Sequence, residues 1–106
     1  MRQVRLAATL VAAALLLGVP ARAQADKKAE RTWKSKCASC HGAAGKGDTD
    51  KGKELKIVDM TTPAFQAKKD DELKKAILEG ASHSFKGDLT PEQVDALVAY
   101  IRTFKK

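Results

Sequence analysis

The most constraining feature of this sequence is a run of five residues, Cys37-Ala38-Ser39-Cys40-His41, in a chain of 106 residues. The chain has no other cysteine, and a histidine directly follows the second one. Two thiols at this spacing beside an imidazole suit a thioredoxin-like redox pair, part of a zinc site, a disulfide or a covalently attached haem. Each of these requires a different fold around it, so the surrounding sequence decides between them.

Haem attachment fits the surrounding sequence best. A redox pair of the thioredoxin type belongs to a βαβ unit, and no strand pattern occurs here. A zinc site needs further ligands, and outside the run only His83 and carboxylates could supply them. A plain disulfide leaves His41 without a role. We therefore predict that Cys37 and Cys40 form thioethers with one haem c, and that His41 binds its iron as the proximal ligand.

Residues 1–25 have the pattern of an export signal. Two arginines precede an apolar run at residues 6–19, and the alanines at 23 and 25 offer small-residue cleavage sites. The run is shorter than the roughly 20 residues that cross a membrane, so a retained anchor helix is the weaker alternative. We expect residues 1–25 to be cleaved on export to the periplasm and residues 26–106 to form one domain that is not embedded in a membrane.

Charge and size narrow the function classes. Loss of residues 1–25 would leave 17 basic against 13 acidic residues, and the five aromatic residues are scattered along the chain. A nucleic-acid binder would need a stronger basic patch or a stacking platform, so we expect no nucleic-acid partner. A domain of about 81 residues is only marginally stabilised by an apolar core of its own. A covalent haem would supply the missing apolar surface.

The apolar periodicity predicts an all-α fold in which helices and ordered loops wrap around the haem. Helices are expected from about residue 27 into the cysteine run, from about 70 to 80, and from 90 onward. Residues 42–53 and 80–89 are expected to be loops, and 55–65 an ordered apolar segment. Five apolar residues of these segments would close over the haem: Leu55, Ile57, Phe65, Phe85 and Leu89.

The sequence defines the start of the last helix more clearly than the start of the helix before it. In the last helix, Thr90 can cap, Pro91 takes the first helical position and Gln93 can close a capping box. Its apolar residues then recur at spacings of three and four, as expected for one buried stripe. For the preceding helix, Asp70 or Asp71 is the candidate cap.

Four further features accompany the cysteine run. They are an aromatic residue four positions before it (Trp33), a Gly-Lys-Gly-Asp loop (Gly45–Asp48), and the segments Leu89–Gln93 and Leu97–Arg102. With them, residues 33–101 resemble a class I monohaem cytochrome c of the short bacterial kind. The resemblance implies that the N- and C-terminal helices cross near the haem edge, with Ala29 and Trp33 against Val98, Tyr100 and Ile101. It also implies one-electron transfer between larger redox proteins rather than an enzymatic activity.

The sequence departs from this family at the sixth iron position. Most members carry a methionine just before the last helix, where this chain has Ser82-His83-Ser84-Phe85. We expect His83 to be the distal iron ligand, because it lies in the ligand-bearing loop. Met60 could instead reach in from the earlier loop, although a packing role suits it better. An open or water-bound iron beside His83 is the third alternative.

The surroundings of the haem are less defined by the sequence. A ligating imidazole normally donates its other N–H to a carbonyl, and for His41 we expect the acceptor within residues 42–48. Thr61 and Thr62 could bind a haem propionate or cap a turn before Pro63.

The function expected from these features is that of a low-spin, monomeric periplasmic carrier with two histidine ligands. Its potential would lie below that of methionine-ligated relatives, because imidazole favours ferric iron relative to a thioether. Transient redox partners would dock through lysines, with Lys46, Lys51, Lys53 and Lys86 as candidates, although the composition alone favours a merely solvated lysine surface over a docking patch. The alternative is a haem enzyme or a sensor that binds peroxide or a diatomic gas at an open sixth position.

Overall fold

The computed structural model of the protein describes residues 21–80 and 83–106, so most of the predicted signal segment lies outside the described residues. The elements, in chain order, are α1 (Ala21–Thr32), a π-helix η2 (Trp33–Cys37), α2 (Ala38–His41), α3 (Asp50–Glu54), α4 (Pro63–Gln66), α5 (Asp70–Glu79) and α6 (Pro91–Arg102). Within these described ranges there is no strand, and a single isolated β-bridge joins Lys86 and Leu89. The predicted all-α fold is therefore confirmed.

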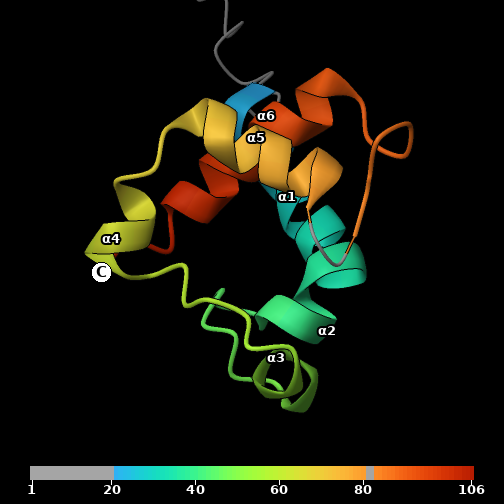
Figure 1. Cartoon of the computed structure of the whole chain (residues 1–106). Helices are drawn as coiled ribbons and strands as arrows, with labels where there is room; N and C mark the ends of the chain where they lie inside the picture. The colour runs from blue at the N-terminus through green and yellow to red at the C-terminus, as the bar shows by residue number, and fades with distance from the viewer. Residues whose placement is uncertain (1–20, 81–82) are drawn as a thin grey trace, which may run out of the picture.

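The centre of the fold is the crossing of α1 with α6. Helix α5 packs against α6 on the side away from α1 (Figure 1). Trp33 and Leu97 are fully buried there, and the Trp33 and Tyr100 rings lie 6.0 Å apart between centroids. Ala29, Val98 and Ile101 are buried as well. The expected contact between the N- and C-terminal helices is confirmed.

The helix starts follow their capping residues, with one correction. Thr90, Pro91 and Gln93 form the predicted capping box at the start of α6. In α5, however, Lys69 occupies the N-cap position without a side-chain bond, so the prediction that Asp70 or Asp71 caps this helix is wrong. Both carboxylates lie in the first turn instead, where their charge stabilises the positive end of the helix dipole.

Two short helices form where loops were expected. Thr49 caps α3 by accepting a hydrogen bond from the Gly52 N–H, and Thr62 caps α4, in which Pro63 takes the first position. The Thr62 hydroxyl is therefore used by the turn. The Thr61 hydroxyl donates to the Asp59 carboxylate at 2.6 Å. These contacts favour the capping role over a propionate contact for this pair.

Helix α1 also begins earlier than expected, at Ala21 rather than near Lys27. Three of the five residues 21–25 are alanines, and alanine has the highest helix propensity, which favours this extension. No helix among those described is long and apolar enough to cross a membrane.

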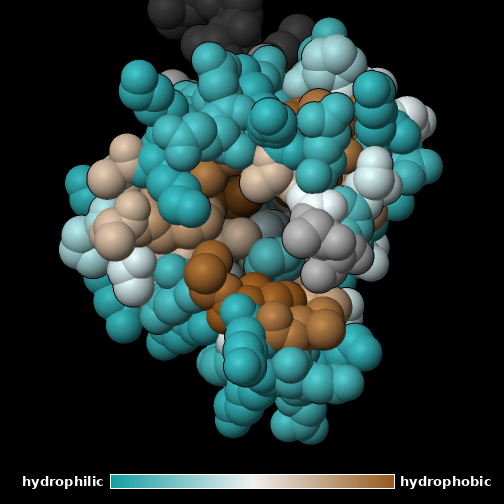
Figure 2. Space-filling model, in the orientation of Figure 1, coloured by the Kyte–Doolittle hydropathy of each residue, from teal (hydrophilic) through white to brown (hydrophobic). Residues whose placement is uncertain are grey.

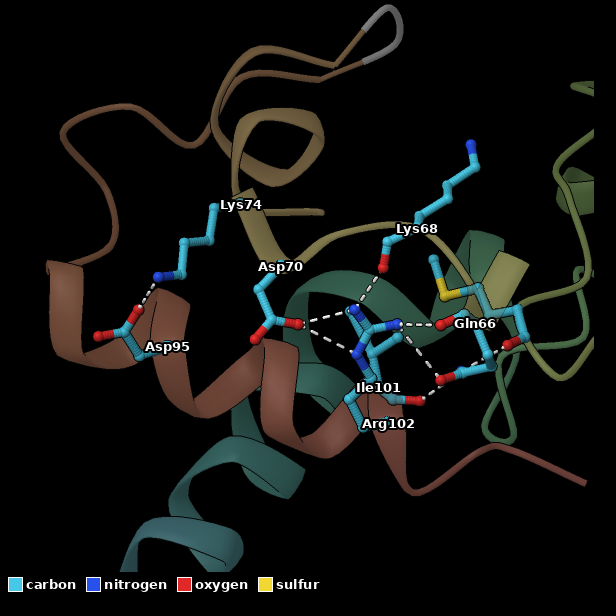
Figure 3. Close-up of polar contacts among 8 residues, drawn as sticks. Gln66, Lys68, Asp70, Lys74, Asp95, Ile101 and Arg102 are labelled. Atoms are coloured by element: carbon cyan, nitrogen blue, oxygen red, sulfur yellow. Dashed lines mark hydrogen bonds and ion pairs between the residues drawn. The ribbon is translucent and has the colours of Figure 1, made fainter. Parts of the chain in front are cut away.

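Arg102 ties the end of α6 to the segment that leads into α5 (Figure 3). Its guanidinium donates to the carbonyls of Gln66 and Lys68, at 2.9 and 2.6 Å, and to the Asp70 carboxylate at 2.7 Å. The Gln66 amide in turn donates to the Ile101 carbonyl at 3.0 Å. This cluster fixes the start of α5, the helix that leads into the loop of His83.

Candidate functional site

The cysteine run lies on a change of helix type. At Trp33 the chain passes from α1 into a π-helical turn, in which the Ala38 N–H donates to the Trp33 carbonyl five residues earlier. Such turns are rare and occur often at functional sites. The turn leads directly into α2, which carries Cys40 and His41.

Both cysteines are unpaired and half-buried. Burial raises the pKa of the Cys37 thiol to about 11. A dithiol used for disulfide exchange has a lowered thiol pKa instead, because the thiolate is the reactive form. The environment of Cys37 therefore disagrees with a redox pair, and both sulfurs are available for thioether bonds.

The backbone around His41 is held by a loop that folds back on α2. The Gly47 N–H donates to the His41 carbonyl at 2.7 Å, and the Thr49 hydroxyl donates to the Cys40 carbonyl at 2.8 Å. The indole N–H of Trp33 donates to the carbonyl of Gly42 at 3.0 Å. Three consecutive carbonyls are thereby satisfied, which fixes the position of the histidine.

Trp33 has a role that the sequence alone did not reveal. Its place before the cysteine run identified it as a core aromatic, and its ring does lie 5.6 Å from that of His41 between centroids. The bond from its indole to Gly42, by contrast, spans nine residues and joins the start of the π-helical turn to the residue that ends α2. Its only sequence signal was the choice of tryptophan, the one large aromatic residue with an N–H donor.

His83 faces His41 across the site. Their ring centroids are 6.2 Å apart and the ring planes are inclined by 64°. Two imidazoles that bind one metal atom from opposite sides also lie with centroids roughly 6 Å apart, because each metal-to-nitrogen bond is about 2 Å. Burial, and to a lesser extent the neighbouring His83, lowers the pKa of His41, which favours the neutral imidazole that binds metals.

The Nδ1 atoms of His41 and His83 are both buried, and neither has a hydrogen-bond partner among the described residues. The carbonyl acceptor that we expected for His41 within residues 42–48 is thus not found there. Within the described ranges no group of three or more histidine, cysteine or acidic side chains could hold a bare metal ion, as a zinc site would require.

Met60 belongs to the hydrophobic core. Its side chain is 8 % exposed, its N–H donates to the Gly45 carbonyl, and its own carbonyl accepts from the Gln66 amide. It packs in one cluster with Trp33 and Phe65. These contacts support packing rather than iron ligation for Met60.

The residues predicted to close over a haem divide into two groups. Phe65 and Leu89 are buried in the core, and Phe85 packs against it. Leu55 is 42 % exposed, and Ile57 is half-buried beside Val58, which is 57 % exposed. Figure 2 shows apolar side chains gathered around a hollow on this face of the molecule. Free thiols, facing imidazoles and an apolar surround fit a haem.

Comparisons with known proteins agree with this site. Residues 24–101 match a family described as cytochrome c oxidase, cbb3-type, subunit III. A solved structure, the KustC0563 c-type cytochrome, is 35 % identical, covers 74 % of this chain and 98 % of its own, and superposes with a TM-score of 0.69. No curated protein matches. The chain therefore belongs to the cytochrome c family as a small monohaem c-type cytochrome with one covalently bound haem c and its iron, and its general function is haem-based electron transfer.

Proposed function

We propose that this cytochrome is a low-spin one-electron carrier in which His41 and His83 bind the iron from opposite sides. Cys37 and Cys40 would hold the haem through thioethers. The observation that carries the proposal is the pair of facing imidazole rings, 6.2 Å apart between centroids. Burial of Met60 in the core supports His83 over Met60 as the distal ligand.

The bound haem supplies the ferric and ferrous states between which one electron is exchanged. The chain's own residues set the conditions for that exchange. Two imidazoles stabilise ferric iron more than an imidazole and a thioether do, so this cytochrome would have a lower potential than methionine-ligated relatives. The hydrogen bonds to the carbonyls of residues 40–42 keep the proximal ligand in one position in both states.

The ferric absorption spectrum tests the ligand pair. Two histidines predict a low-spin spectrum without the far-red charge-transfer band of a thioether ligand, and slow or absent carbon monoxide binding after reduction. A thioether band would show that Met60 is the ligand. A high-spin spectrum with rapid carbon monoxide binding would instead indicate a haem enzyme, or a sensor of peroxide or a diatomic gas.

We further propose that the protein is exported to the periplasm, is monomeric and docks transiently on larger redox proteins. Four exposed lysines are candidates for docking: Lys46, Lys51, Lys53 and Lys86. Lys51 and Lys86 lie 3.8 Å from the carboxylates of Glu54 and Glu79. Such exposed ion pairs are weak, so these two lysines stay available to an acidic partner.

Charge-steered docking is tested by ionic strength. Association steered by lysines slows as salt rises, because screening shortens the reach of exposed charges. Stopped-flow electron transfer with the physiological partner should therefore slow between low and physiological salt. A rate independent of salt would contradict lysine-steered docking without affecting the ligand assignment.

A further inference from the structure

The end of α5 places a glycine directly against the ring of His83. A methyl group added at Gly80 would lie 3.1 Å from Cε1 and 3.4 Å from Nδ1 of His83, and 2.5 Å from the Ala76 carbonyl oxygen. The backbone of Gly80 is in the ordinary extended region, with φ −66° and ψ 163°, which any residue adopts. Space, rather than backbone conformation, therefore requires glycine here.

The ring of Phe85 contacts His83 from another side. The two ring centroids lie 4.9 Å apart with an inclination of 38°. Phe85 itself packs against the hydrophobic core, and the ammonium of Lys36, next to the cysteine run, lies 6.0 Å from the centre of its ring. The imidazole is thus held between the end of a helix and an aromatic ring that is anchored elsewhere.

The loop that carries His83 is joined to α5 by its neighbour. The Ser84 hydroxyl donates to the Leu78 carbonyl at 2.8 Å, which satisfies one of the free carbonyls at the end of the helix. The edge of the His83 ring that carries Cε1 and Nδ1 lies against Gly80. Nε2 is therefore the ring nitrogen that is left for the iron.

The geometry points to Gly80 and Phe85 as a clamp that positions His83 as the distal ligand, an inference that rests on the proposed His41 and His83 ligation. Neither clamp residue binds the iron, so both are positioning residues. Gly80 admits the imidazole at the end of α5, and Phe85 keeps it from rotating away. The clamp therefore decides how often the sixth position opens to a small ligand.

The chain offers a matched pair of glycine variants to test this clamp in the holoprotein. Gly80→Ala adds a methyl group that must displace His83 or the end of α5, without demanding an unusual backbone angle. Gly87→Ala lies in the same loop and has the opposite character, with a φ of +89° and nothing within 4 Å of the added methyl group. It strains the backbone but does not touch His83.

We expect Gly80→Ala to show a high-spin ferric fraction and to bind carbon monoxide at least tenfold faster than the wild type after reduction. Added imidazole should restore its low-spin spectrum. Gly87→Ala should keep the wild-type spectrum and a carbon monoxide rate within twofold, even if its thermal midpoint falls. A fully low-spin Gly80→Ala with the wild-type rate would overturn the clamp, as would an equal change in Gly87→Ala.

Phe85→Leu tests the other half of the clamp, and decides the matter if Gly80→Ala yields no holoprotein. Its carbon monoxide rate should exceed that of the wild type by several-fold, since leucine fills similar space but lacks the flat ring face. An unchanged rate would overturn the inference. The wild-type spectrum separates this result from the proposed function, because a wild type without two histidine ligands would refute the ligation itself before any variant is compared.

Discussion

The two sides of the site are held in different ways. On the proximal side, the carbonyls of residues 40–42 each accept a hydrogen bond, two from the loop that follows and one from the indole of Trp33. On the distal side, the described part of the loop offers one side-chain hydrogen bond, from Ser84, and His83 is positioned by packing against Gly80 and Phe85. Hydrogen bonds to consecutive carbonyls fix a backbone, whereas packing allows a side chain to leave. The proximal ligand should therefore be permanent and the distal ligand exchangeable.

The largest expected effect comes from removing each ligand in turn. His41→Ala should yield little stable holoprotein, because the haem would lose the ligand that the fixed backbone of residues 40–42 holds in place. His83→Ala should keep its covalent haem and its helical content, but bind carbon monoxide at least a hundredfold faster than the wild type. Haem content, circular dichroism and stopped-flow rates measure this difference. Equal loss of holoprotein in both variants would show that the two sides are equally structural.

The proximal side was also the more predictable from the sequence. The positions of Cys37, Cys40 and His41 relative to one another follow from spacing within a single turn, so a motif can describe them. The indole bond of Trp33 spans nine residues and the packing of Gly80 against His83 spans three. Both depend on the path that the chain takes at the end of a helix, which no residue motif describes.

Errors in the predicted helices have a similar cause. The helices α3 and α4 are single turns, too short for an apolar period to be visible, and only Thr49 and Thr62 mark their starts. At α5, the Asp70 carboxylate lies in the first turn and accepts a hydrogen bond from Arg102 of α6, a long-range contact that the local sequence does not indicate. The α6 capping box needs four consecutive residues and was therefore predictable.

The second prediction compares one hydrogen bond from each side. Trp33→Phe removes the indole donor from the Gly42 carbonyl, which keeps only the Gly45 N–H, and it shrinks a fully buried side chain. Together these losses should lower the free energy of unfolding by about 2–3 kcal/mol. Ser84→Ala removes an exposed bond and should cost about 0.5 kcal/mol, but it should raise the carbon monoxide rate several-fold, since the loop is freed from α5. Denaturant unfolding and ligand binding, measured on both variants, separate the effects. A large stability loss in Ser84→Ala would refute the contrast.

The third prediction concerns the attachment of α5 to the rest of the fold (Figure 3). Arg102→Lys keeps the charge but cannot reach two carbonyls and the Asp70 carboxylate together, so we expect a loss of about 1.5 kcal/mol in unfolding free energy. Lys74→Ala is the control, because it removes the exposed ion pair with Asp95 and should have no measurable effect. Hydrogen exchange should show the Arg102→Lys change in α5 and not in α2. Equal protection losses in both helices would mean that the two sides unfold together.

The smallest expected effect is on the pH dependence of stability, and it comes from Asp59 in the segment between α3 and α4. Hydrogen bonds from the hydroxyl and N–H of Thr61 lower the pKa of the Asp59 carboxyl below its usual 3.8. Near this usual pKa the folded state thus binds fewer protons than the unfolded state. The stabilisation that the ionised Asp59 contributes is therefore complete above the unfolded pKa, and it is lost as the pH falls through the folded pKa. Asp59→Asn keeps an oxygen acceptor for Thr61 but no charge, and should flatten the acid side of a plot of Tm against pH. Asp88→Asn, in the distal loop, is the control for loss of one exposed charge and should keep the wild-type slope. Identical profiles for Asp59→Asn and the wild type would show that the Asp59 carboxylate does not contribute to the order of its segment.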